Sequence, residues 1–535
     1  MNGDRFSRRE VTAGLGATIA AGGFGRAFAS PAPVLIDDLA AGAPISPFIY
    51  GSNETGAMDG GGASVDFDRP AGVTVRRLGG DLITCYNWRN NATNAGKDYK
   101  HANGAFLLET LQVAPAMRAR PAAVIDAFLA NSRAASAQSL VTLPLAGFVA
   151  ADFDGPVAPE DTAPSRRFAP LDWSRAATPG AVDIPALLAL LVDRHGGAAA
   201  GGIRGYYLDN EPDLWTQTHP RIVRNPTTIT SLIARSLVAA KAIKAADPDA
   251  WVLGPASWGA TGMATLQNAS DWPDYRAHEN FLAAYLDAFR RESERTGQRL
   301  LDFLDVHWYP MSRRGALFRT EDPALAPALL AAPRSLDEPG FCEDSWVVEA
   351  LGCSAGPGLH LPLLPSLSAL VRENFPGLGL SFGEYNYGGA GRVASGLAMA
   401  DVLGRFGRSG VAIATHWGAL TGWIGEAFRL YRQTDSAGES FGATSLPVCG
   451  AGADLSLFSA RSDKDRIHLV VINKSERPAR LELCLASGRA PALRETLGFD
   501  ESRPRCGPIE EAREPSAAGL LMTAPPLSAR RYRLA

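Results

Sequence analysis

Cysteine is scarce in this chain, and the few cysteines are not arranged to hold a metal. Six occur among 535 residues, with no CxxC pair and no Cys/His spacing of the zinc-site kind. We therefore do not expect a thiolate metal site. Cys342 and Cys353 could close the loop between them in an exported protein, while the other four fit equally well as buried thiols. The sequence leaves the pairing open.

Strong charge of one sign is also lacking. The formal net charge is −4, the isoelectric point is about 6.1, and no lysine-rich run occurs. A nucleic-acid-binding protein carries a basic patch, and binding to anionic lipid favours a basic run. We therefore expect neither partner and favour an uncharged ligand.

Long apolar runs are missing as well. The N-terminus has Ser7-Arg8-Arg9, a weakly apolar stretch over 11–24 and a small-x-small site at 27–29. The stretch is shorter than the ~20 residues that a membrane-spanning helix needs. Its arrangement is typical of a twin-arginine export signal over residues 1–29. We expect an exported, periplasmic or extracellular protein that does not insert into a membrane and acts as a monomer.

What the sequence does contain is a repeated strand–helix pattern. Short apolar runs that end in Gly, Asn, Pro or Asp alternate with stretches of helical composition, the best of which are 122–136, 184–194, 229–246, 279–296 and 364–374. Eight predicted strands result: 45–51, 73–78, 140–145, 203–208, 251–255, 303–307, 379–383 and 411–415. They predict a (β/α)8 TIM barrel, an α/β fold, over residues 45–444. A doubly wound sheet would instead show a glycine-rich turn after its first strand.

The pattern changes near residue 445. Alternating runs at 454–459, 467–473, 479–485 and 529–534 have no helix-length segment between them, which predicts an antiparallel β-sandwich over 445–535. The segment 30–44, which contains the run 33–39, could add an edge strand to it. No Ser/Thr/Pro-rich linker or internal repeat indicates an appended cellulose-anchoring module.

Two glutamates follow predicted barrel strands. The fourth strand is followed by Asp-Asn-Glu-Pro-Asp at 209–213, and the seventh by Glu-Tyr-Asn at 384–386. Catalytic groups of such barrels lie at these strand ends, and glycosidic cleavage needs two carboxyl groups. One such glutamate alone would more often be a solvated charge or a helix cap. Their shared position favours Glu211 as acid/base and Glu384 as nucleophile of a retaining glycosidase.

Neighbouring strand ends offer supporting groups. His307 ends the sixth strand and Tyr309 follows it, and because side chains alternate in direction, one could hydrogen-bond Glu384 and the other line the cleft. Arg77 ends the second strand, and because a buried arginine needs a partner, we expect it to brace a carboxylate. Asn210 is placed to hydrogen-bond the 2-hydroxyl of the reacting sugar.

Aromatic side chains are the remaining candidates. Trp417, after the eighth strand, could form the floor under the reacting sugar, because aromatic faces pack on the C–H faces of pyranose rings. For any single His or Trp, core packing explains the residue equally well. The predicted substrate-binding residues are Asn87, Trp88, Trp258, Trp308, Tyr385 and Trp423.

Several motifs together resemble one known family. The stretch Arg-Leu-Gly-Gly to Thr-Asn-Ala-Gly over 77–96, Asn-Glu-Pro-Asp-Leu-Trp and Gly-Glu-Tyr-Asn are similar to glycoside hydrolase family 44, from about residue 33 to the C-terminus. The resemblance implies an endo-β-1,4-glucanase or xyloglucanase that acts on a polysaccharide or oligosaccharide, with Glu211 and Glu384 in the roles given above. It implies no required cofactor but allows a structural calcium, although no EF-hand loop is found.

Three alternatives are weighed against this interpretation. A metal-dependent hydrolase would use Asp209, Asp213, Asp305, His307 and His416, but the first strand lacks a His-x-His pair. A non-catalytic sugar-binding protein would usually lack a catalytic glutamate. An exo-acting β-xylosidase or arabinofuranosidase stays open, because the insertions 147–202 and 311–378 could either close the cleft or extend it. The choice of β-glycan is also open.

Overall fold

A computed structural model describes residues 31–54, 64–174, 178–353, 358–450, 452–510, 514–515 and 519–535. The predicted export signal, residues 1–29, lies outside this range. Within the described residues, no helix combines the length and the apolar character needed to cross a bilayer.

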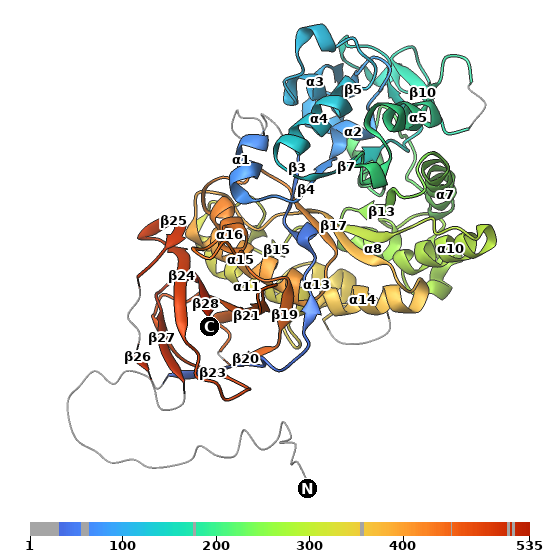
Figure 1. Cartoon of the computed structure of the whole chain (residues 1–535). Coiled ribbons are helices and arrows are strands. Elements are labelled where there is room, and N and C mark those ends of the chain that lie inside the picture. Colours follow the sequence, from blue (N-terminus) through green and yellow to red (C-terminus); the bar gives the residue numbers. More distant parts are fainter. Residues whose placement is uncertain are drawn as a thin grey trace.

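Eight parallel strands close into a barrel (Figure 1). Their spatial order is β12, β13, β14, β17, β18, β3, β4 and β7. In chain order they are β3 (Gly51–Asn53), β4 (Val75–Leu78), β7 (Gln138–Leu143), β12 (Gly205–Leu208), β13 (Trp251–Ser257), β14 (Phe303–Trp308), β17 (Gly379–Tyr385) and β18 (Ile413–His416). The predicted (β/α)8 barrel is confirmed.

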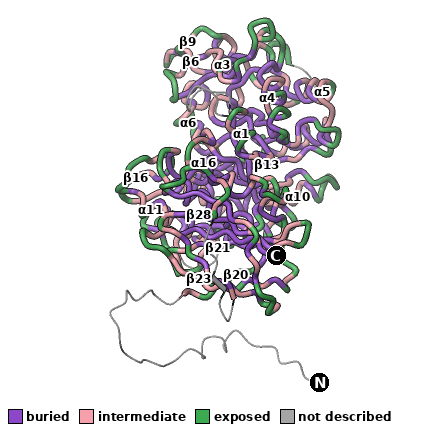
Figure 2. Tube along the Cα trace, turned by 60° about the vertical axis from the view of Figure 1, so that its left-hand side comes forward, coloured by how far each residue is buried: buried purple, intermediate pink, exposed green. Residues whose placement is uncertain are grey.

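The barrel strands β4 and β12 are buried on both faces (Figure 2). Burial makes β12 a continuous apolar run, whereas β4 carries two buried arginines, Arg76 and Arg77. The first strand differs from the prediction of 45–51. Ser46 caps a 3₁₀ turn, η1 (Pro47–Ile49), by accepting a hydrogen bond from the Phe48 N–H, and strand β3 begins only at Gly51. Proline favours this turn because its missing N–H is not needed at the first position.

Helices surround the barrel and alternate with its strands. Several begin where predicted because a polar side chain caps the first turn: Asp183, Thr228 and Asn280 each accept a backbone N–H three residues on. The principal helices are α1 (Ser64–Ala71), α4 (Ala123–Ala134), α5 (Ile184–His195), α7 (Ile229–Ala246), α10 (Phe281–Thr296), α14 (Leu363–Asn374), α15 (Val393–Arg408) and α16 (Gly422–Arg432).

Long excursions leave the barrel after β4, β7, β13 and β14. The first two contain α2 (Asp81–Thr84), β5 (Thr93–Asn94), β6 (Ala102–Gly104), α3 (Phe106–Thr110), β8 (Phe148–Ala150), β9 (Gly155–Pro156), β10 (Phe168–Asp172) and β11 (Val182–Asp183). The others contain α8 (Ala260–Thr265), α9 (Trp272–Tyr275), β15 (Met311–Ser312), β16 (Gly315–Ala316), α11 (Ala326–Ala331), α12 (Arg334–Asp337) and α13 (Val347–Leu351). These excursions build the walls around the strand ends.

The C-terminal strands form the predicted β-sandwich, red in Figure 1. One sheet has the order β20-β1-β23-β27-β26, and the other β2-β19-β21-β22-β28-β24-β25. The N-terminal strand β1 lies inside the first sheet, between β20 and β23, so the prediction of an edge strand is wrong: β1 is hydrogen-bonded on both sides. The strands are β1 (Ala32–Ile36), β2 (Ala43–Pro44), β19 (Thr444–Leu446), β20 (Val448–Gly450), β21 (Leu455–Arg461), β22 (Ile467–Asn473), β23 (Ala479–Leu485), β24 (Leu493–Asp500), β25 (Arg503–Pro508), β26 (Glu514–Pro515), β27 (Leu520–Ala524) and β28 (Ser528–Leu534).

The structure adds β24, β25 and β27 to the four sandwich strands that the alternating runs predict. β25 carries Arg503 and Arg505 around a proline and lies at the sheet edge, where a strand tolerates both features. The two sheets share a core that includes Val34, Leu469 and Tyr532. The limits 45–444 and 445–535 remain our proposed division of the chain.

Candidate active site

Glu211 stands in a strained turn after β12. Asp209 and Glu211 have positive φ values of 68° and 41°, which non-glycine residues rarely adopt outside tightly held sites. The turn is held because the buried Asp209 carboxylate accepts a hydrogen bond from Thr84 and from backbone N–H groups of the β7 loop. The Glu211 N–H donates to Ala256, which lies at an irregularity in β13. Together these bonds aim Glu211 into the barrel mouth.

Glu384 lies on β17 and has two strong partners. Arg77 Nη1 is 2.8 Å from Glu384 Oε1, and the Tyr309 hydroxyl donates to Glu384 Oε2 at 2.8 Å. Arg77 is fully buried and is itself fixed by the side-chain oxygens of Asn53 and Asn210. Such charge-assisted hydrogen bonds favour the ionised carboxylate.

His307 lies between the two glutamates. Its Nδ1 is 2.8 Å from Glu211 Oε1 and 3.5 Å from Glu384 Oε2. One oxygen of each glutamate and one nitrogen of His307 all lie within 4.8 Å of one another. Burial lowers the pKa of His307 well below its usual value, aided by the Arg77 charge, so the ring is neutral and bridges the pair without adding charge.

The two carboxyl groups differ in electrostatic environment. Burial, and then the negative charge of Glu384, raise the pKa of Glu211 well above its ordinary value. Burial also raises the pKa of Glu384, but Arg77 and the Tyr309 hydroxyl oppose that rise. Glu211 is therefore the group that holds a proton while Glu384 carries the charge.

Asn210 is held at both ends of its amide. Its Oδ1 accepts from Arg77 at 2.8 Å, and its Nδ2 donates to Asp81 Oδ1 at 3.1 Å. Burial and nearby carboxylates raise the pKa of Asp81 to about 7. Among the described residues, no hydrogen bond uses the second amide hydrogen of Asn210.

An aromatic cavity of about 520 Å³ opens beside Glu211. Trp417 is one of its walls, and its ring packs over Gly80, where a Cβ would come within 2.4 Å of the indole. The positive φ of Gly80 also favours glycine there. The lining residues are Glu211, Trp258, Gly259, Ala260, Trp308, Tyr309, Met311, Phe318, Arg319, Trp346, Val347 and Trp417.

Comparisons with known proteins agree with this geometry. A model of glycoside hydrolase family 44 matches residues 92–312. The structure of a family 44 endoglucanase from Clostridium thermocellum has a TM-score of 0.87 and 34% identity to this chain, covering 94% of it and 99% of the endoglucanase. The structure of a family 44 xyloglucanase from Paenibacillus polymyxa, solved with xyloglucan, has a TM-score of 0.86 and 33% identity to this chain. The match covers 94% of this chain and 99% of the xyloglucanase.

The chain belongs to glycoside hydrolase family 44. This confirms the family recognised in the sequence and the predicted enzyme class, a glycoside hydrolase of endoglucanase type. The beta-mannanase/endoglucanase A of Caldicellulosiruptor saccharolyticus is 34% identical over 492 residues, which are 86% of this chain and 36% of that protein. The chain thus spans about a third of that relative's length.

Four predicted substrate-binding residues of this family 44 chain lie outside the cavity beside Glu211. Asn87 and Trp88 are buried, and their side-chain nitrogens donate to backbone carbonyls. Tyr385 is fully buried against Phe406 of α15, because side chains alternate along β17 and Glu384 takes the inward direction. Trp423 packs on Phe499 of the sandwich. The structure thus places these four side chains away from Glu211, and their predicted part in substrate binding stays a prediction.

Other residues of the family 44 site were missed by the sequence reasoning. Asn53 of β3 donates to the carbonyls of Gly383 and Thr415 and accepts from Arg77, which ties four strands around Glu384. Trp346 and Phe318 come from the insertion after β14. The only signal for them was their aromatic character, because nothing local fixes the path of so long a loop.

The metal-hydrolase alternative fails on geometry. Asp209, Asp213 and Asp305 each accept a hydroxyl hydrogen bond from a different segment, and none joins His307 or His416 in a cluster of metal ligands among the described residues.

A structural calcium is not supported by the clusters of the described residues. One cluster is the hydrogen-bonded set of Glu211, His307 and Glu384. In the other, Asp435, Glu439 and His468, cationic side chains lie 2.8 to 3.7 Å from both carboxylates. Calcium takes six to eight oxygen ligands, which neither set supplies.

Proposed function

We propose that this protein is a retaining endo-β-1,4-glucanase that cleaves internal bonds of a cellulose- or xyloglucan-like polysaccharide. The observation that carries the proposal is the close approach of Glu211 and Glu384, with an oxygen of each within 4.8 Å. A separation of ~5–5.5 Å suits direct attack by the second carboxylate, whereas inverting enzymes need ~6.5–9.5 Å to admit a water. The aromatic lining of the cavity supports a neutral sugar polymer as the ligand.

The proposed reaction has two displacements. The carboxylate of Glu384 attacks the anomeric carbon while Glu211 gives its proton to the glycosidic oxygen, so that the carbon–oxygen bond breaks and the sugar becomes esterified to Glu384. Glu211 is left ionised by this proton transfer, and it stays ionised because esterification removes the negative charge of Glu384 that helps to raise the pKa of Glu211. The Glu211 carboxylate then takes a proton from water as that water attacks the ester, which releases the sugar and restores both glutamates. The free amide hydrogen of Asn210 binds the 2-hydroxyl of the reacting sugar.

Product analysis tests both halves of the proposal. Incubation with soluble xyloglucan and with cello-oligosaccharides is expected to release a ladder of oligomers, and proton NMR is expected to detect the β-anomer of the new reducing end first. Release of monomer alone would replace endo with exo action, as in a β-xylosidase or arabinofuranosidase. First appearance of the α-anomer would contradict the retaining mechanism.

Replacing Tyr309 by Phe tests the hydrogen bond to Glu384. Because a hydrogen bond to a charged group contributes ~1.5–3 kcal/mol, we expect kcat/KM to fall about 10- to 100-fold. The bond stabilises the ionised form, so its loss raises the pKa of Glu384. Activity requires the ionised form, and the acidic limb of the pH–rate profile is expected to move to higher pH.

The matched control for Tyr309→Phe is Tyr385→Phe. The Tyr385 hydroxyl is buried, has no hydrogen-bond partner among the described residues and lies outside the cavity. Its removal is expected to change kcat/KM by less than about twofold. Equal pH profiles for the two variants would contradict the role given to Tyr309.

We also propose that the protein is exported as a monomer by the twin-arginine route, with residues 1–29 as the signal. The support is the Ser-Arg-Arg motif before a short apolar stretch and a small-x-small site. N-terminal sequencing of the exported protein tests the proposal, and a mature chain that starts near residue 30 is the expected result.

A further inference from the structure

Two tryptophans from different excursions meet on one wall of the cavity. The rings of Trp258 and Trp346 are stacked, with centroids 5.9 Å apart and planes 21° apart. Both line the cavity that reaches Glu211, and both are only half-buried. Trp215, which does not line this cavity, is by contrast only 1% exposed. The stacked pair therefore presents aromatic surface to a ligand.

Trp258 is tied to the loop that carries Glu211. Its backbone N–H lies 3.2 Å from the carboxylate of Asp213, two residues beyond Glu211, and its indole Nε1 donates to Gln267 at 3.0 Å. Asp213 is further fixed by the Ser257 hydroxyl at 2.8 Å. The ring is therefore preorganised next to the proposed acid/base.

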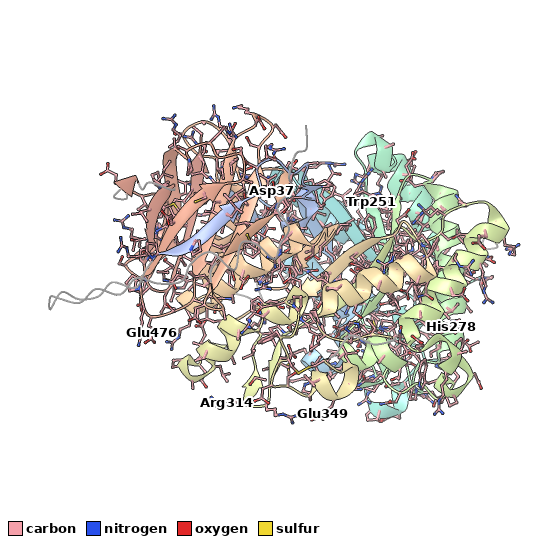
Figure 3. The ribbon with its side chains drawn as sticks, turned by 90° about the horizontal axis from the view of Figure 1, so that it is seen from below. Asp37, Trp251, His278, Arg314, Glu349 and Glu476 are labelled. Carbon is pink, nitrogen blue, oxygen red and sulfur yellow. A yellow bond between two sulfur atoms is a disulfide. The ribbon has the colours of Figure 1, made fainter. Side chains whose placement is uncertain are left out.

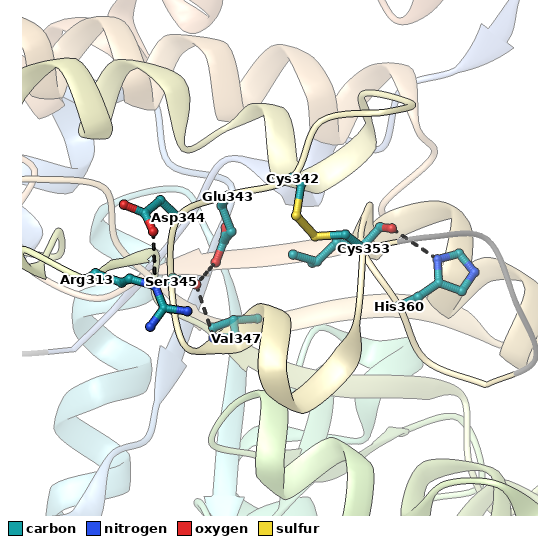
Figure 4. The surroundings of a disulfide bond; sticks show 9 residues. Arg313, Cys342, Glu343, Asp344, Ser345, Val347, Cys353 and His360 are labelled. Atoms are coloured by element: carbon teal, nitrogen blue, oxygen red, sulfur yellow. Dashed lines mark hydrogen bonds and ion pairs between the residues drawn. A yellow bond between two sulfur atoms is a disulfide. The ribbon is translucent and has the colours of Figure 1, made fainter.

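Trp346 is held by a loop that a disulfide closes. Cys342 and Cys353 are joined by a disulfide with a sequence separation of 11 (Figure 4). Trp346 lies between them in the sequence, immediately before α13. The Ser345 hydroxyl accepts the Val347 N–H at 3.1 Å and so fixes the turn that leads into this short helix. Closing the loop removes conformations in which Trp346 would leave the cavity wall.

The same loop is also anchored from outside. Arg313, in the β15–β16 hairpin, lies 3.1 Å from Asp344 and 2.7 Å from Glu349. In Figure 3, Arg314, the residue that follows Arg313 in the hairpin, and Glu349 are labelled close together at one edge of the molecule. Both ion pairs are exposed and so contribute little each. The disulfide is the stronger restraint on Trp346.

We propose that Trp258 and Trp346 form a subsite for a β-linked pyranose unit of the leaving group, and that the Cys342–Cys353 loop exists to position Trp346. The inference rests on the proposed function. Glu211, which would protonate the leaving oxygen, lines the same cavity, whereas Glu384 is not among the lining residues. A sugar bonded to that oxygen is therefore directed towards the tryptophan pair, and its C–H face can pack on an indole ring.

The test compares two substrates. Cellohexaose places glucosyl units on the leaving-group side, whereas 2,4-dinitrophenyl β-cellobioside places none there. For Trp346→Ala we expect kcat/KM on cellohexaose to fall about 3- to 10-fold, with the aryl glycoside changed by less than about twofold. Trp346→Phe is expected to restore most of the loss.

A double variant without the disulfide tests the role of the loop. Cys342→Ser/Cys353→Ser is expected to lower kcat/KM on cellohexaose about 2- to 5-fold, again sparing the aryl glycoside. Unchanged cellohexaose kinetics in this variant would overturn the role of the loop. Unchanged kinetics in Trp346→Ala, or equal losses on both substrates, would overturn the subsite.

Failure of the proposed function is detected separately. A wild-type chain that hydrolyses neither substrate would contradict the proposed function, but binding can still be measured by titrating tryptophan fluorescence with cellohexaose. On the Glu384→Gly background, Trp346→Ala is expected to raise Kd about 3- to 10-fold. An unchanged Kd would overturn the subsite whatever the catalytic result.

Discussion

Glu384→Gly is expected to lower kcat on xyloglucan by a factor on the order of 10⁵, because no other carboxylate can form the glycosyl ester. Folding should survive, since Arg77 keeps its hydrogen bonds to Asn53 and Asn210 when its ionic partner is gone. Thermal unfolding followed by circular dichroism checks this point. The measurement of activity is reducing-sugar release over hours at high enzyme concentration.

Azide provides the decisive addition to the Glu384→Gly experiment. The anion fits the space of the lost carboxylate and attacks the anomeric carbon from the same face, so activity on an aryl glycoside should return with an α-glycosyl azide as product. Glu373→Gly, on the exposed end of α14, is the control and should keep full activity. Unchanged turnover in Glu384→Gly would remove Glu384 from the mechanism.

Glu211→Ala is expected to be the second largest loss, with a dependence on the leaving group. On polysaccharide, where the leaving alcohol must be protonated, kcat/KM should fall about 10²- to 10⁴-fold. On 2,4-dinitrophenyl β-cellobioside the first step needs no acid, so a burst of dinitrophenolate should precede slow hydrolysis of the ester. Azide should speed that second step and give the β-glycosyl azide, the opposite anomer to the Glu384→Gly product.

The pH dependence of the same Glu211 variant gives an independent readout. The folded site raises the pKa of Glu211, and the protonated form is the active one. Wild-type activity should therefore be present below that pKa and be lost as the pH rises through it. Glu211→Ala should lack this basic limb. Equal losses on both leaving groups, together with an unchanged pH profile, would contradict the acid/base role.

The barrel and the position of its two glutamates could be predicted from the sequence because both depend on local patterns. A strand buried on both faces is a continuous apolar run, so β12 and β17 were recognisable, and the residue after such a run lies at the barrel mouth. Helix caps such as Thr228 are equally local. Turns are harder to predict from the sequence. Ser46 and Pro47 form a 3₁₀ turn where the apolar pattern predicts the beginning of the first strand.

Only the tertiary structure decided which side chains meet at Glu211 and Glu384. Tyr385 points away from the cavity because of the strand register beside an irregularity in β17. The loop that brings Trp346 to Trp258 takes its course from a disulfide and from packing against α8. His307 could be placed at a strand end, but not between two carboxyl groups, because its 2.8 Å contact joins residues 96 positions apart. A one-dimensional pattern specifies burial and direction within an element, whereas contacts between distant loops follow from the packing of the whole chain.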